Sequence, residues 1–396
     1  MFESTKLHLD LEFSSGIENA YRFSANELMD ATGGNFGNLV FRHALRSILK
    51  DFGELTPINW PNARQAAATN RIDYVVVSCA NWLGASEEDE LRSLGRAQII
   101  ESFDCQVLPF GLGTQAPSGA KNLTLGPHTI RLARALSSKC NLIGVRDTFT
   151  ARVLEGVGVM NTIVTGCPSN FINLDANLGN SIIQRASNTA KAFSGWDQMR
   201  TIVSEVGASN LLGNMLGTTI LKFLRNNPGF YVIQSPNVLP FLLGLERDLP
   251  AGYRIGVSDN ELSALRSTLL SSVLYFSSVE AWLDFSRTCS VSFGNRVHGA
   301  MVALQAGIPS LLIGHDARTE GLAEEMAIPL VNEVEFESVI EQVPEALLSL
   351  IAKLMQGYDD RRRILAGRFL SLLRDNGLDP SEEFLRFGEI RDGPAA

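Results

Sequence analysis

The chain has 396 residues, of which 45% are hydrophobic and 19% are charged, and its formal net charge is −9 at pH 7. The composition is that of a globular protein and excludes a disordered chain, while the length favours two domains of roughly 150–200 residues each. The acidic balance argues against a broad nucleic-acid footprint, which needs a basic surface, so we expect no nucleic-acid partner.

Short apolar runs alternate with helical patterns along the first half of the chain. A glycine-rich turn at residues 32–38 precedes a helical pattern over residues 39–49. The strand candidates are residues 74–78, 106–110, 142–145 and 163–165. Such alternation predicts a parallel sheet covered by helices.

The second half repeats this pattern, so we expect two α/β halves with a cleft between them. Its strand candidates are residues 201–203, 231–234, 273–276, 290–293 and 310–313. Residues 173–196 hold no strand pattern and are interpreted as a linker with a flanking helix. The tail favours a solvated helix that carries Arg361, Arg362 and Arg363. The predicted boundaries are an N-terminal domain (1–180), a linker (181–200), a C-terminal domain (201–357) and a helical tail (358–396).

Cysteine usage and hydropathy indicate the compartment. The five cysteines are odd in number, and no two have CxxC spacing, which favours buried free thiols in a reducing compartment. The five histidines do not cluster, so we expect no metal site. No secretory apolar run and no uncharged stretch of the ~18 residues of a spanning helix is present. We expect a cytoplasmic protein, with docking at the inner face of a membrane left open.

The first glycine-rich turn is a candidate ligand-binding turn at the N-terminus of a helix. Its sequence is TGGNFGN, and Asn38 is a candidate cap for the helix that follows. Backbone N–H groups at a helix start favour anions or hydroxyls. The turn has neither a Walker ending nor the dinucleotide GxGxxG spacing. A purely structural turn is the competing interpretation.

A second turn, after the strand candidate 142–145, carries Arg146. Asp147 or Thr148 is expected to cap a helix that ends at Gly156. The guanidinium fork of Arg146 suits a phosphate or a carboxylate. The alternative is a salt bridge from Arg146 to Asp147 or to another surface carboxylate.

The third turn lies within residues 292–314, which predict a strand, a glycine turn, an apolar helix and a second buried strand. A turn after a parallel strand is where open α/β sheets bind ligands. Arg296 and His298 flank one residue, so in an extended turn they point to the same side. Histidine, with a reference pKa of about 6.5, can give or take a proton at neutral pH. A structural histidine is the alternative.

Two further loops belong to the same predicted rim. Residues 112–117 follow the strand candidate 106–110 and give a weak signal. The loop after residues 310–313 is a stronger candidate, because at least one of its polar side chains is expected to reach the cleft, with a solvated loop as the alternative. These side chains are His315, Asp316, Arg318 and Glu320.

The three turns, in this order, resemble the motifs of the polysaccharide pyruvyl transferase family. Residues 34–38 (GNFGN) are similar to its GNxGD-type turn, residues 146–150 (RDTFT) to its RDxxS-type turn, and residues 296–309 (RVHGAMVALQAGIP) to its late RxH segment. The resemblance spans roughly residues 30–330. Three positions depart from the pattern: Asn38 replaces an acidic residue, Thr150 a serine and Arg318 a lysine.

The resemblance implies a fold like that of GT-B glycosyltransferases: α/β, with two Rossmann-like domains and parallel sheets that face across a cleft. It implies transfer of the pyruvyl group of phosphoenolpyruvate to a sugar of a cell-surface polysaccharide or its lipid-linked precursor. The product is a pyruvate ketal and phosphate is released, with no metal and no cofactor beyond phosphoenolpyruvate as co-substrate. For this chemistry we predict His298 as the catalytic acid, Arg296, Arg146, Asn295 and Gly299 as donor-binding residues, and Asn35 and Asn38 as acceptor-binding residues.

Two other functions remain open from the sequence. A GT-B glycosyltransferase that uses a nucleotide sugar would have the same fold, and Glu320 or Glu324 falls near the position of a ribose-binding carboxylate. A non-catalytic glycan-binding relative is the second alternative, and Asn38 in place of the usual acid is its supporting feature.

Overall fold

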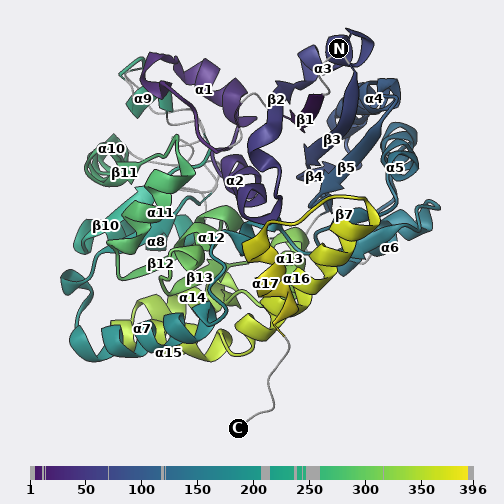
Figure 1. Cartoon of the computed structure of the whole chain (residues 1–396). Helices are drawn as coiled ribbons and strands as arrows, with labels where there is room; N and C mark the ends of the chain where they lie inside the picture. Colours follow the sequence, from purple (N-terminus) through teal and green to yellow (C-terminus); the bar gives the residue numbers. More distant parts are fainter. Residues whose placement is uncertain are drawn as a thin grey trace.

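The structure is a computed structural model that describes residues 5–10, 13, 15–69, 71–116, 120, 122–206, 215–235, 239–242, 244–246, 259–314 and 316–390. Figure 1 shows two α/β halves, purple to blue and teal to green, with the yellow C-terminal helices beside both. Both halves are built on parallel sheets, so the expected α/β fold with parallel sheets is confirmed.

The N-terminal half contains a parallel sheet with the order β2-β1-β3-β5. A backbone bridge from Leu112 to Val145 leads to a second parallel pair, β7 and β8. The strands are β1 (Thr5–Asp10), β2 (Leu55–Asn59), β3 (Ile72–Ser78), β5 (Gln106–Phe110), β7 (Ile143–Val145) and β8 (Thr162–Val164), and the short β4 (Asn81–Leu83) pairs with β6 (Gly113–Thr114). The helices are α1 (Ala25–Thr32), α2 (Asn38–Ile48), α3 (Trp60–Thr69), α4 (Glu87–Ser102), α5 (Pro127–Lys139) and α6 (Thr148–Gly156).

The C-terminal half has one six-stranded parallel sheet with the order β11-β10-β9-β12-β13-β14. Numbered from its first strand, this is the Rossmann order 3-2-1-4-5-6, and the order reverses between β9 and β12. The strands are β9 (Thr201–Ser204), β10 (Gly229–Val232), β11 (Val273–Leu274), β12 (Val291–Gly294), β13 (Ser310–Ile313) and β14 (Leu330–Val331). The helices are α7 (Leu178–Ala192), α8 (Met215–Asn226), α9 (Leu239–Leu242), α10 (Asp259–Ser272), α11 (Val279–Arg287), α12 (Val297–Gln305), α13 (Ala317–Met326), α14 (Glu333–Ile340) and α15 (Pro344–Leu354).

Every strand predicted from the sequence is present, although several are shorter or shifted by one or two residues. β1 and β2 were not predicted. In β1 the polar residues Lys6 and His8 interrupt the buried Leu7 and Leu9. β2 contains Pro57 and has one buried residue, Leu55, because it forms the edge of the sheet, where proline is tolerated.

The predicted linker contains an ordered helix, α7, which contacts α15. The N-terminus of α7 has no cap from its own segment. Instead, Asp359 accepts hydrogen bonds from the backbone N–H groups of Gly179 (2.7 Å) and Asn180 (3.0 Å). A carboxylate at this position neutralises the positive end of the helix dipole. Residues 181–192 are therefore helical, while the domain boundaries themselves remain predictions.

The tail forms α16 (Tyr358–Asp375) and α17 (Glu382–Glu389), which return to the N-terminal half. α16 contacts β7 and β8, and Phe369 stacks on Phe110 with 5.9 Å between the ring centroids. The solvated-helix interpretation is wrong for Arg362, which is completely buried. Its guanidinium donates to the backbone carbonyls of Asn170 (3.2 Å), Asp175 (2.8 Å) and Asn173, so it binds a loop that the helix covers.

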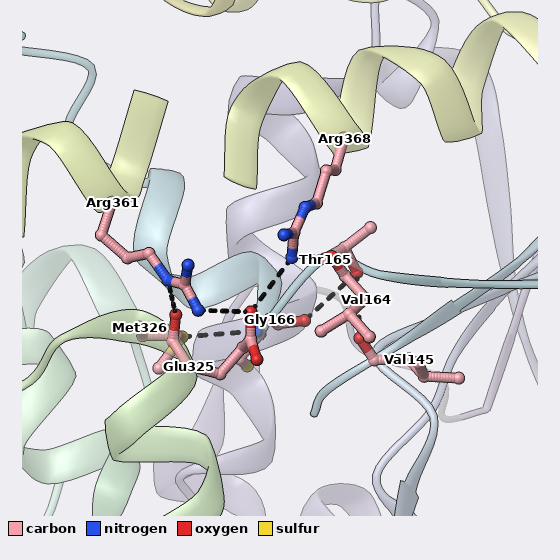
Figure 2. Close-up of polar contacts among 9 residues, drawn as sticks. Val145, Val164, Thr165, Gly166, Glu325, Met326, Arg361 and Arg368 are labelled. Carbon is pink, nitrogen blue, oxygen red and sulfur yellow. Dashed lines mark hydrogen bonds and ion pairs between the residues drawn. The ribbon is translucent and has the colours of Figure 1, made fainter. Parts of the chain in front are cut away.

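A second buried charge joins α13, α16 and β8 (Figure 2). The carboxylate of Glu325 pairs with Arg361 at 2.8 Å and with Arg368 at 3.1 Å, and Arg368 also donates to the carbonyl of Val164 at 3.2 Å. Burial raises the pKa of the Glu325 carboxyl, against the two arginines, which lower it. We call α16, α17 and the residues that they bind the tail contact.

Candidate functional site

A cavity lies between the two halves, close to the point where the strand order of the C-terminal sheet reverses. Its volume is ≈ 110 Å³. Because one water needs at least about 10–15 Å³ by the same measure, the cavity has room for more than a single water and can hold a small ligand. The lining residues come from both halves: Asn35, Asn38, Ala80, Asn81, Arg146, Gln234, Asn295, Arg296, Val297, His298, Thr319 and Leu322. The expected cleft between two parallel-sheet domains is therefore present.

Arg146 enters the cavity from the carboxyl end of β7 and is 4% exposed. Its guanidinium donates to Asn81 Oδ1 at 3.1 Å and to the carbonyl of Cys79 at 3.3 Å, and it lies 5.4 Å from the centre of the Phe41 ring. Its buried Nε has no hydrogen-bond partner among the described residues. Gly113 makes room for it, because a Cβ there would lie 3.1 Å from Arg146 Cδ.

The predicted salt-bridge alternative for Arg146 is not what the structure shows. Asp147 accepts a hydrogen bond from the backbone of Thr150 at 2.6 Å and caps α6, which ends at Gly156 as expected. No described carboxylate forms an ion pair with Arg146. Thr150 stands where the family pattern has a serine. Its hydroxyl accepts a hydrogen bond from the backbone N–H of Thr114 at 3.2 Å, so it contacts the backbone of the protein.

Arg296 follows β12 and is the residue that precedes the first turn of α12. Its Nη2 donates to the hydroxyl of Ser235 at 2.6 Å and lies 3.8 Å from Glu205 Oε2. The side chain is 25% exposed, and its buried Nε has no hydrogen-bond partner in the described part of the chain. One edge of the guanidinium is thus fixed by the protein while the residue lines the cavity.

Glu205, which directly follows β9, lies beneath Arg296 and is completely buried. Its Oε2 accepts from the backbone N–H groups of Gln234 (2.8 Å) and Ser235 (2.6 Å). Burial raises the pKa of this carboxyl, while Arg296 and the two backbone donors lower it. Sequence reasoning missed Glu205, although a charged residue two positions after the strand candidate 201–203 was a usable signal.

His298 lies in the first turn of α12 and is half-buried. Its ring packs on Phe41 with 5.3 Å between centroids, and its Nε2 lies 3.7 Å from the sulfur of Cys167. Arg146, Arg296 and His298 therefore line one cavity, with Arg146 coming from the N-terminal half and the other two from the C-terminal half. Their roles in binding and catalysis remain predictions.

The glycine turn of the N-terminal half reaches the same cavity through Asn35 and Asn38. Asn38 is not the cap of α2, as the sequence suggested, because Gly37 holds the cap position and Asn38 begins the helix. The side chain of Asn38 instead donates to the carbonyl of Thr32 at 3.0 Å, and Asn35 Oδ1 accepts from the backbone of Gly37 at 2.7 Å.

The remaining donor-side predictions, Asn295 and Gly299, flank the start of α12. Asn295 is 5% exposed and lines the cavity, and its Oδ1 has no hydrogen-bond partner among the described residues. Gly299 lies behind the lining. A Cβ at this position would lie 2.4 Å from Ser204 Cβ, so only glycine allows α12 to approach β9 this closely.

The predicted rim loop contributes to the cavity through residues that were not predicted. Thr319 and Leu322 of α13 line it. Asp316 caps α13 by accepting from the backbone of Thr319 at 2.7 Å, and Glu320 is exposed and outside the lining. His315 and the side chain of Arg318 lie outside the described residues. Asn81, which follows the strand candidate 74–78, and Gln234, which ends the strand candidate 231–234, were also missed.

The protein is an α/β protein with two parallel-sheet units. Together they enclose a cavity lined by two arginines, a histidine and several amides. The family model of polysaccharide pyruvyl transferases matches residues 35–317, which is most of the chain. The chain belongs to the polysaccharide pyruvyl transferase family, and this membership assigns it to transferases that act in polysaccharide pyruvylation.

Solved structures resemble the chain only remotely. UDP-GlcNAc 2-epimerase from Neisseria meningitidis, bound to UDP-GlcNAc, is 14% identical with a TM-score of 0.40, over 85% of this chain and 82% of that chain. The wall teichoic acid polymerase TagF is 10% identical with a TM-score of 0.36, over 84% and 76% of the two chains. No curated protein sequence matches the chain significantly. In the described part of the chain, no helix is both long and apolar enough to cross a membrane.

Proposed function

We propose that the chain transfers the pyruvyl group of phosphoenolpyruvate to a sugar of a cell-surface polysaccharide or of its lipid-linked precursor, with release of phosphate. The observation that supports this proposal is the convergence of Arg146 and Arg296 on one cavity together with His298. Phosphoenolpyruvate carries a phosphate and a carboxylate, and guanidinium forks bind both groups well.

The start of α12 adds to the donor side of this proposal. The cap residue of this helix makes no side-chain hydrogen bond to it, and the helix dipole favours negative charge at this end. Arg296 lies at the same helix start, and Arg146 lines the same cavity from the other half. In the proposal, the phosphate and the carboxylate of the donor are shared between these two cations.

His298 is the proposed acid. Its imidazolium donates a proton to the methylene carbon of phosphoenolpyruvate, and the central carbon becomes electrophilic. A sugar hydroxyl then forms a C–O bond to that carbon, and its proton restores the imidazolium. The C–O bond to phosphate breaks, a second hydroxyl closes the ketal, and the second hydroxyl proton leaves with the phosphate. The proposal needs no metal and no cofactor beyond phosphoenolpyruvate.

Asn35 and Asn38 are the proposed acceptor residues, because they line the cavity from the N-terminal half. Amide side chains both donate and accept hydrogen bonds, as sugar hydroxyls require. A lipid-linked acceptor would bring the protein to a membrane surface, and such peripheral contact at the inner face belongs to the proposal.

The test is incubation of the protein with phosphoenolpyruvate and a panel of glycan and lipid-linked acceptors. We expect release of inorganic phosphate and a pyruvate-sized mass gain on one acceptor. Release of a nucleoside diphosphate from a nucleotide sugar would instead identify a glycosyltransferase. Binding of phosphoenolpyruvate without transfer to any acceptor would identify a non-catalytic relative.

A further inference from the structure

Gln234 is a buried amide at the cavity that the sequence motifs do not include. It follows β10, is 1% exposed and is one of the lining residues. Its main chain is held from both halves: the N–H donates to Glu205 Oε2 at 2.8 Å, and the carbonyl accepts from the N–H of Phe36 at 2.9 Å. The backbone of Gln234 is therefore fixed independently of its side chain.

The side chain lies in a slot between two glycines, one from each half. A Cβ on Gly37 would lie 2.5 Å from Gln234 Oε1, and a Cβ on Gly299 would lie 2.7 Å from Gln234 Nε2. Any larger residue at either position would collide with the amide. Two backbone segments far apart in the sequence thus leave space for one carboxamide, which limits where its polar end can lie.

The hydrogen-bonding state of this amide is unusual. Nε2 is buried and has no partner among the described residues. Buried amide nitrogens in native proteins are nearly always hydrogen-bonded, and an exception calls for an explanation. Nε2 lies on the Gly299 side of the slot, so it is the NH₂ group of the carboxamide that is held at the start of α12.

The surroundings indicate which ligand group this is. Gln234 approaches Gly299, in the first turn of α12, where the helix dipole favours an anion. Arg296 and His298, at the start of the same helix, also line the cavity. A hydrogen-bond donor held here faces the donor side of the site.

We propose that Gln234 is a donor-binding residue whose side-chain NH₂ group donates a hydrogen bond to an oxygen of the bound anion. The identity of that anion as phosphoenolpyruvate rests on the proposed function. The oxygen belongs to its phosphate or to its carboxylate, and the two are separable by experiment.

The test compares the binding of phosphoenolpyruvate and of inorganic phosphate by calorimetry in the wild type and in Gln234→Met and Gln234→Glu. Methionine keeps the length of the side chain but cannot donate, so we expect affinity for phosphoenolpyruvate to fall about tenfold to a hundredfold. Glutamate keeps the shape and adds a like charge, so its loss should be larger. Weaker binding of both anions assigns the contact to the phosphate, and weaker binding of phosphoenolpyruvate alone assigns it to the carboxylate.

Gln305→Met is the matched control. Gln305 is also buried, at 3% exposure, but its amide is engaged: Oε1 accepts from the N–H of Asn173 at 2.8 Å and Nε2 donates to the hydroxyl of Tyr358 at 3.2 Å. We expect this variant to lower the thermal midpoint and to leave the affinity for phosphoenolpyruvate unchanged. The opposite pattern is expected for Gln234→Met.

Unchanged affinity for phosphoenolpyruvate in Gln234→Met, or a change confined to the acceptor KM, would overturn the inference. If the wild type binds phosphoenolpyruvate but transfers nothing, the proposed function fails, and the binding comparison still decides the role of Gln234. If the wild type binds neither anion, both proposals fail.

Discussion

The cavity and the tail contact are both buried and polar, but they differ in how their polar atoms are satisfied. At the tail contact, Arg362 donates to three carbonyls and Glu325 pairs with two arginines, and Asn170 Nδ2 is the buried atom there without a partner among the described residues. More such atoms gather in and around the cavity. In the described part of the chain, lining residues contribute Arg146 Nε, Gln234 Nε2, Asn295 Oδ1, Arg296 Nε and Thr319 Oγ1, and Ser204 Oγ and Glu205 Oε1 lie behind the lining.

The difference in hydrogen-bonding separates groups that stabilise the fold from groups whose partners a bound ligand can supply. A saturated buried network contributes to stability, whereas an unpaired buried polar atom costs stability and persists where function needs it. The cavity atoms gather at the carboxyl ends of β7, β9, β10 and β12. Substitutions at the cavity should therefore change binding and turnover, and substitutions at the tail contact should change stability.

The largest effect is expected from His298→Ala. Loss of a well-placed acid lowers kcat by roughly 10²–10⁴-fold, while the affinity for phosphoenolpyruvate stays largely intact because the cations remain. Steady-state kinetics with phosphate detection, together with calorimetry, measures the two quantities. His128, which lies outside the cavity lining, provides the control variant His128→Ala. Near-wild-type turnover in His298→Ala would remove the residue from the mechanism.

Arg362→Met is the corresponding substitution at the tail contact, where we expect an effect on stability. Methionine fills much of the space but leaves the carbonyls of Asn170, Asn173 and Asp175 without their charged donor. We expect the free energy of unfolding to fall by roughly 3–5 kcal/mol, measured in urea. The affinity of the remaining folded protein for phosphoenolpyruvate should be unchanged, and a selective loss of that affinity would blur the distinction between the two regions.

Much of the fold and part of the candidate site could be predicted from the sequence. Strands of the two sheets are visible as apolar runs, and the charged turn residues Arg146, Arg296 and His298 stand out against them. Because the carboxyl ends of parallel strands meet at one edge of a sheet, those residues could be expected to converge, and they line one cavity.

The missed features depend on partners far away in the sequence. Gln234 and Asn81 are uncharged residues after strands, and nothing local marks them as cavity residues. Arg362 has the pattern of a surface helix, because the carbonyls it binds lie in a loop almost two hundred residues earlier. Periodicity reports which face of a helix is apolar, but not which loop an arginine will satisfy.

Arg296→Lys sharpens the comparison within the cavity. An ammonium cannot reproduce the fork that binds Ser235 on one edge and an anion on the other, so we expect affinity for phosphoenolpyruvate to fall about tenfold or more. Arg361→Lys, in the tail contact, should leave that affinity unchanged. Equal donor affinity in Arg296→Lys and the wild type, by calorimetry, would count against the donor role.

A smaller, pH-dependent effect is expected at Glu325. Burial raises the pKa of this carboxyl above its ordinary value of 4.5, so its protonated form favours the folded state. The stabilisation that the protonated Glu325 carboxyl contributes is complete below about pH 4.5, and it is lost as the pH rises through the folded-state pKa. The stability of the wild type relative to Glu325→Gln should therefore decline as the pH rises from about 4 to 7 in urea unfolding. The reverse trend would mean that Arg361 and Arg368 outweigh burial.

The smallest effect is expected from Asn38→Ala, which tests the acceptor side. The substitution removes a neutral amide from the cavity and its bond to Thr32, so we expect the acceptor KM to rise by a few-fold while affinity for phosphoenolpyruvate is unchanged. Asn141→Ala, which removes an amide bonded to Asp375 at the tail contact, should alter neither quantity. If Asn38→Ala behaves as Asn141→Ala does, the glycine turn belongs with the saturated, structural region, and only the donor side of the cavity keeps a functional assignment.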